Sequence, residues 1–155
     1  MNGPTVTALR AVLAAGLAGS VLVQAVLVPL LAIDLDGTPA ATRWPVVAIV
    51  VLGVATIQVG MVCVWRLLTL VGRGTVFSEA AFRYVDLIAA AAATAALLLF
   101  SLGVVLAPGE GVAPGVVLLV GGAGGLVAGV ALLVVVMRAL LAQAVDIRTE
   151  LDAVI

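Results

Sequence analysis

The chain has 155 residues, of which 65% are apolar and 10% charged, with a formal net charge of -1 and a mean hydropathy of +1.41. So few polar side chains could not cover a water-soluble domain, so we expect an integral membrane protein whose surroundings are the lipid bilayer. The few basic residues argue against direct nucleic-acid binding. With no histidine and only Cys63, we expect no metal or cofactor, and we interpret Cys63 as a small apolar side chain.

Four apolar runs are long enough to cross a bilayer, since about 20 helical residues cover a hydrocarbon core about 30 Å thick. A lone strand cannot satisfy its backbone in lipid, so each run predicts a helix despite its valine content. The predicted fold class is all-α: one domain, residues 1–155, forming an integral membrane four-helix bundle with short connectors and a cytoplasmic extension of the fourth helix. The spans are 11–33, 46–65, 84–106 and 116–137, and the helical tail is 138–155.

The arginines set the predicted orientation. With four spans, only Arg43 falls on one side of the membrane, and the other six arginines fall on the opposite side. The positive-inside rule then places both termini and the second connector of this multi-pass chain in the cytoplasm. The arginines on the cytoplasmic side are Arg10, Arg66, Arg73, Arg83, Arg138 and Arg148.

The fourth apolar run carries glycine at every fourth position, at Gly121, Gly125 and Gly129. This spacing places the glycines on one helix face, where two backbones can approach closely, and close packing holds helices together in lipid. The stripe therefore predicts helix packing. Its neighbour is expected to be either another helix of the same chain or a second copy in a homodimer.

Polar residues inside the spans are few, and we interpret them as contacts between helices. Counted from the inner ends of the spans, Gln24 lies about 20 Å deep and Gln58 about 10 Å deep. This difference predicts no direct bond between the glutamines and favours a hydrogen bond between Gln58 and Thr94, worth on the order of 1 kcal/mol. Pro29 lacks a backbone N–H and is expected to kink the outer third of the first helix.

The connector "GRGTVFSEAAFRYVD", residues 72–86, contains a clear helix-start signal. Ser78 is a favourable N-cap, and Glu79 precedes Arg83 by one turn, the better order for a helical ion pair. Arg83 can also reach Asp86. Because Asp86 lies within the apolar register of the third span, its depth makes it a functional candidate.

The tail continues the fourth helix without a breaker and is amphipathic. Its apolar face has to pack against the second connector, another copy of the chain or a different partner. That face comprises Leu140, Ala144, Ile147, Leu151 and Val154. We predict a docking surface formed by the connector and the tail, with Arg73, Glu79, Arg83, Asp86, Asp146, Arg148, Glu150 and Asp152 as its candidate residues.

Three segments, "VFSEAAFRYVDLI", the "APG" of residues 113–115 and "LAQAVDIRTELD", resemble a bacterial membrane protein family called domain of unknown function 2975 (DUF2975). The resemblance covers nearly the whole chain, although members often end on an Asp-Leu-Thr-Val-like sequence where this chain ends "DAVI". The family has no assigned activity. Its members are often encoded beside a small helix-turn-helix regulator, so the resemblance implies a regulatory or sensing context. The residues that carry it are Phe77, Ser78, Glu79, Arg83, Asp146, Arg148, Glu150 and Asp152.

Three classes of function compete. An enzyme is disfavoured, because the sequence offers no nucleophile paired with a base and no phosphate-binding loop, and we therefore expect no catalytic residues. A proton-coupled exporter would need a carboxylate near the membrane midplane, and Asp86 lies too near the inner face. An oligomeric transporter or channel subunit remains the alternative. The preferred hypothesis is a small regulatory or sensing protein whose cytoplasmic connector and tail dock a partner.

Overall fold

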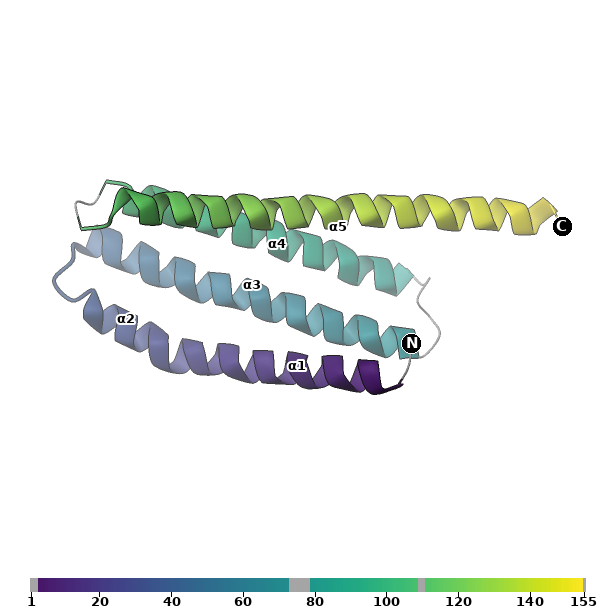
Figure 1. The fold of residues 1–155 in the computed structure, drawn as a ribbon, viewed down its shortest axis with the longest axis horizontal. Coiled ribbons are helices and arrows are strands. Elements are labelled where there is room, and N and C mark those ends of the chain that lie inside the picture. Colours follow the sequence, from purple (N-terminus) through teal and green to yellow (C-terminus); the bar gives the residue numbers. More distant parts are fainter. Residues whose placement is uncertain (1–2, 73–78, 109–110, 155) are drawn as a thin grey trace.

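The computed structural model describes residues 3–72, 79–108 and 111–154, and within these residues every regular element is a helix (Figure 1). Four helical segments are long and apolar enough to cross a membrane, which confirms the predicted all-α membrane bundle. The first segment comprises α1 (Gly3–Leu22), a π-helical turn η1 (Val23–Leu27) and α2 (Val28–Asp34). The other three are α3 (Ala40–Gly72), α4 (Glu79–Leu106) and α5 (Pro114–Val154).

The helices extend well beyond the apolar runs from which they were predicted. The first segment begins at Gly3, where the sequence placed the span start at residue 11, and α3 continues to Gly72, past the predicted end at residue 65. Pro45, which the sequence placed in a connector, lies inside α3. Apolar composition marks the part of a helix that sits in lipid, whereas the helix itself continues through polar residues until its backbone bonding is broken.

The connector between α2 and α3 turns on Gly37. The backbone N–H groups of Leu35 and Asp36 bond back to carbonyls of α2, and Thr38 bonds the carbonyl of Leu35. Gly37 adopts φ = 102°, which strongly favours glycine because it has no Cβ. This tight turn brings α3 back alongside the first helix.

Pro29 interrupts the first helix as predicted. In a regular α-helix its N–H would bond the carbonyl of Ala25, and proline has no such donor. The preceding turn widens into η1, where the N–H of Val28 bonds the carbonyl of Val23, five residues back. Figure 1 shows α2 inclined relative to α1 beyond this point, so the expected kink is confirmed.

The helices pack mainly on their neighbours in the chain. The first segment lies against α3, α3 against α4, and α4 against α5 (Figure 1). Between the described residues of α1 and α5 there is no extensive contact. The small residues Ala89 and Ala96 are buried on α4, and Cys63 is a free side chain buried on α3 with 2% of its surface exposed. Large apolar side chains such as Leu118, at 77% exposure, face outward, as expected for a surface that contacts lipid.

Two glycines outside the predicted stripe make the close approaches. A Cβ on Gly16 would lie 2.9 Å from the Met61 sulfur, and a Cβ on Gly124 would lie 3.3 Å from side-chain atoms of both Leu99 and Phe100. Gly16 therefore lets α1 approach α3, and Gly124 lets α5 approach α4.

The predicted packing of the stripe against another helix of the same chain is not found. A Cβ built on Gly121, Gly125 or Gly129 would meet nothing within 4 Å. The spacing correctly identified a smooth helix face, but the rotation of α5 about its axis directs Gly124 toward α4 instead. Among the residues that the structure describes, the stripe therefore has no close neighbour.

We expect Gly124→Val to lower the free energy of unfolding by about 1–3 kcal/mol, because its side chain would overlap Leu99 and Phe100. Gly122→Val is the matched control, since the same β-branched residue is added to α5 where space is open. Thermal unfolding of both purified variants in detergent measures the difference. Equal loss of stability in the two variants would mean that Gly124 is not the packing contact.

Candidate functional site

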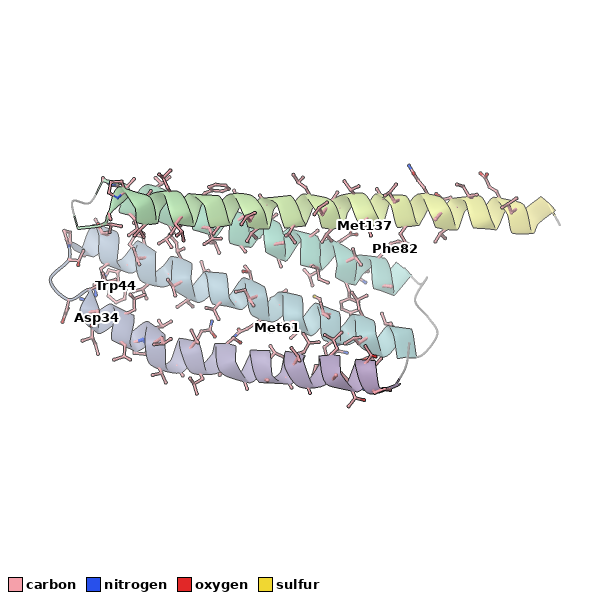
Figure 2. The ribbon with its side chains drawn as sticks, viewed as in Figure 1. Asp34, Trp44, Met61, Phe82 and Met137 are labelled. Atoms are coloured by element: carbon pink, nitrogen blue, oxygen red, sulfur yellow. The ribbon has the colours of Figure 1, made fainter. Side chains whose placement is uncertain are left out.

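An ion pair joins α4 and α5 near the arginine-rich end, by which we mean the end of the bundle where α1 begins, α3 ends and α4 begins. The Asp86 carboxylate lies 2.6 Å from Nε of Arg138 and accepts a hydrogen bond from Nη2 of Arg138 at 2.9 Å. The guanidinium also lies 5.8 Å from the centre of the Phe82 ring, within the range of a cation–π contact. In Figure 2, Phe82 on α4 and Met137 on α5 mark this position.

The Arg138 side chain was absent from the candidate residues predicted from the sequence, and the predicted contact between Arg83 and Asp86 is replaced by the pair with Arg138. The sequence positions of Asp86 and Arg138 could have predicted this pair. Asp86 lies two residues inside the third apolar run, and Arg138 directly follows the fourth. Because consecutive spans run in opposite directions, these two positions fall at similar depth near the same end of the bundle. The sequence argument considered only Arg83, on the same helix, as a partner for Asp86.

Two cavities adjoin this ion pair. One, of about 340 Å³, is lined by Phe82, Arg83, Asp86, Arg138 and Ala142. The other, of about 580 Å³, is lined by Arg83, Tyr84, Asp86, Leu87 and Ala90. Arg83 and Asp86 line both. Arg83 is exposed, and it forms no ion pair with any side chain that the structure describes; the side chain of Glu79, its predicted partner one turn earlier, is not among them.

The structure describes the side chains of four of the eight predicted docking residues, Arg83, Asp86, Asp146 and Glu150. Arg73 and the predicted N-cap Ser78 lie outside the described residues, and the side chains of Glu79, Arg148 and Asp152 are not described. Asp146 and Glu150 are exposed on α5, and neither forms an ion pair within the described part of the chain. Arg83 and Asp86 thus line the same two cavities, and Asp146 and Glu150 are not among the described residues that line them.

A second polar cluster lies within the membrane-spanning part, between the first segment and α3. Gln58 donates through Nε2 to Oε1 of Gln24 at 2.9 Å, with Oγ of Ser20 3.2 Å away. Gln24 in turn donates to the backbone carbonyl of Val51 at 3.2 Å. Gln24 belongs to the π-helical turn η1, so the widened turn carries the side chain that bonds α3.

The prediction of a Gln58–Thr94 bond is therefore wrong. The Thr94 hydroxyl donates at 2.8 Å to the carbonyl of Ala90 in its own helix, and Gln58 shares the α3 face of Met61, which meets α1 (Figure 2). Depth along a helix does not say which face a residue occupies. Counting from the observed helix ends, Gly3 and Gly72, leaves a similar offset, and the long side chains of Gln24 and Gln58 bridge it.

The opposite end of the bundle carries a separate charged contact. Arg43 at the start of α3 pairs with Asp36 in the preceding connector, and its guanidinium lies 5.4 Å from the centre of the Trp44 ring. This contact links the connector to α3. Within residues 3–72, 79–108 and 111–154, no three His, Cys, Asp or Glu side chains gather to hold a metal ion.

We expect Gln58→Leu to destabilise the protein by about 1 kcal/mol, because it removes the side-chain contacts of Gln58 with Gln24 and Ser20. Thr94→Val is the control, since that hydroxyl bonds only its own helix. Unfolding in mixed detergent micelles measures both free energies. A larger loss from Thr94→Val than from Gln58→Leu would contradict the observed cluster.

The Asp86–Arg138 pair should show a coupling free energy of about 1 kcal/mol or less, because 51% of the Asp86 side chain and 40% of the Arg138 side chain are exposed. The test is a double-mutant cycle with Asp86→Ala and Arg138→Ala, followed by unfolding in micelles. A parallel cycle with Arg83→Ala should give no coupling to Asp86. Coupling in the Arg83 cycle alone would restore the pairing predicted from the sequence.

Comparison with known proteins identifies the family. No curated protein and no solved structure matches the chain. A family model described as "Protein of unknown function (DUF2975)" matches residues 30–155, a range that includes Asp86, Arg138 and Gln58 and leaves out Ser20 and Gln24. Since this match covers most of the chain, the protein belongs to the DUF2975 family of membrane proteins, as the sequence segments indicated.

Proposed function

We propose that the protein is a regulatory or sensing interaction protein of the bacterial inner membrane, and that the end of α5 docks a soluble partner. The observation that carries this proposal is the length of α5. At 1.5 Å per residue its 41 residues span about 60 Å, roughly twice the thickness of the hydrocarbon core. Figure 1 shows α5 continuing past the ends of α3 and α4.

The distribution of charge supports a cytoplasmic position for this extension. Four described arginines lie toward the arginine-rich end, and Arg43 lies at the other end. By the positive-inside rule, the arginine-rich end faces the cytoplasm together with both termini. The four are Arg10, Arg66, Arg83 and Arg138.

The surface of the extension supports docking. Glu79 opens α4 only two turns before Asp86, so α5 passes the end of α4 about two turns after Arg138. Beyond that point Ile147 is 58% exposed and Leu151 is 60% exposed. Apolar side chains held out in water favour association, and the helix presents them beside exposed carboxylates. The family resemblance supplies the class of partner, a small helix-turn-helix regulator.

The alternative, an oligomeric transporter or channel subunit, has less support. Its strongest observation is the Ser20–Gln24–Gln58 cluster, whose members bond one another or backbone carbonyls and connect two helices. Asp86 is paired near the arginine-rich end of the bundle, away from the middle of the spans. A homodimer is compatible with either function, and the open stripe of Gly121, Gly125 and Gly129 is where we propose that a second copy would pack.

Photocrosslinking in intact bacterial cells tests the docking proposal. A photoreactive residue at Ile147 is expected to capture a small helix-turn-helix regulator, identified by mass spectrometry. The control position is Val104 on α4, which is 73% exposed but lies within a membrane span. Replacing Asp146 and Glu150 together by alanine should abolish the capture and leave membrane insertion intact.

The other products of this experiment are also informative. A product of twice the chain mass would assign the extension to a homodimer. Products within the chain alone would make the extension structural, and a transport assay on the reconstituted protein would then test the alternative. Unchanged capture by the Asp146/Glu150 double variant would contradict a role for the two carboxylates.

A further inference from the structure

The two cavities beside the Asp86–Arg138 pair have an unbalanced charge. Both side-chain oxygens of Asp86 are engaged by Arg138, so the negative charge of this carboxylate is already matched. Arg83 lines both cavities and has no ion-pair partner among the described residues. The cavities therefore hold one positive charge that is not neutralised within the described structure, together with the phenol of Tyr84.

The residues that line the larger cavity change from polar to apolar along α4. Arg83 and Tyr84 lie near the N-terminus of α4, whereas Leu87 and Ala90 lie one and two turns farther into the span. A site for a free anion needs only the charged part. Here the charged residues are followed by apolar residues that lie deeper in the span. A phospholipid has the same order of groups, with its phosphate at the interface and its acyl chains deeper.

We propose that this site binds a phosphate-bearing anion, and that the anion is the headgroup of an acidic phospholipid in the inner leaflet. Arg83 contributes the charge-assisted hydrogen bonds to the phosphate, and the Tyr84 hydroxyl is placed to donate another. Leu87 and Ala90 contact the first carbons of the lipid chain. Arg138 remains committed to Asp86, which fixes the α4–α5 spacing beside the site. Basic pockets between helices on the cytoplasmic side bind acidic headgroups on the same principle. The proposal does not depend on a partner docking to α5.

The test uses the full-length protein in phosphatidylcholine nanodiscs that contain a minor fraction of phosphatidylglycerol, with native mass spectrometry of the released protein. The wild type should retain phosphatidylglycerol in preference to phosphatidylcholine. Arg83→Gln should weaken this retention about tenfold, through loss of a charge-assisted phosphate contact. Arg66→Gln is the control and should leave the retention of phosphatidylglycerol nearly unchanged. Arg66 is an exposed arginine on α3 and is not among the described residues that line either cavity. Because Arg83 is exposed and has no ion-pair partner among the described side chains, its replacement should not affect folding.

An arm with inorganic phosphate separates the two sources of the anion. Failure of millimolar phosphate to displace phosphatidylglycerol supports the lipid. Phosphate binding that requires Arg83, without any preference for phosphatidylglycerol, would overturn the lipid and assign free phosphate to the site. Retention that is unaffected by Arg83→Gln, or lowered equally by Arg66→Gln, would overturn the site itself and leave only general attraction to acidic lipid.

Discussion

The structure depends on the need to satisfy every backbone hydrogen bond inside lipid, where water offers no alternative partner. This requirement makes each membrane-crossing segment helical, even where valine would favour a strand in water. It also makes the π-helical turn in the first segment informative. The missing donor of Pro29 is accommodated by the π-helical turn η1, and that turn presents Gln24 to α3. The missing backbone donor of Pro29 therefore leads to a turn that places the Gln24 side chain where it connects two helices.

Once the helices exist, hydrophobicity does little to choose their neighbours, because lipid tails are as apolar as leucine. Close approach at Gly16 and Gly124 and a few polar contacts decide the arrangement. The glutamine cluster connects the first segment to α3, and the Asp86–Arg138 pair connects α4 to α5. These contacts lie between neighbours in the chain, and the glycine stripe on α5 stays open. The result is a row of helices whose last member carries a glycine face without a close neighbour among the described residues.

The ion pair and the cavities beside it lie near the start of α4, toward one end of the bundle. A charged pair deeper in the membrane would be costly, and one in open water would contribute little. At this level Asp86 and Arg138 retain partial solvation and still fix the spacing of two helices. Arg83, one turn away, keeps its charge available. About two turns beyond the ion pair, α5 passes the end of α4, so the cavities and the extension lie next to each other along α5.

The sequence by itself determined the number of spans, the helical class, the kink at Pro29, the continuous helix into the tail and the family, because these follow from composition, length and local backbone chemistry. It could not determine which face of each helix meets a neighbour. The rotation of each helix about its axis places Gly124, and not Gly125, at the contact between α5 and α4. It also brings Gln58 to Gln24 and pairs Asp86 with Arg138. Periodicity defines a face but not its partner, and only the packed structure fixes that choice.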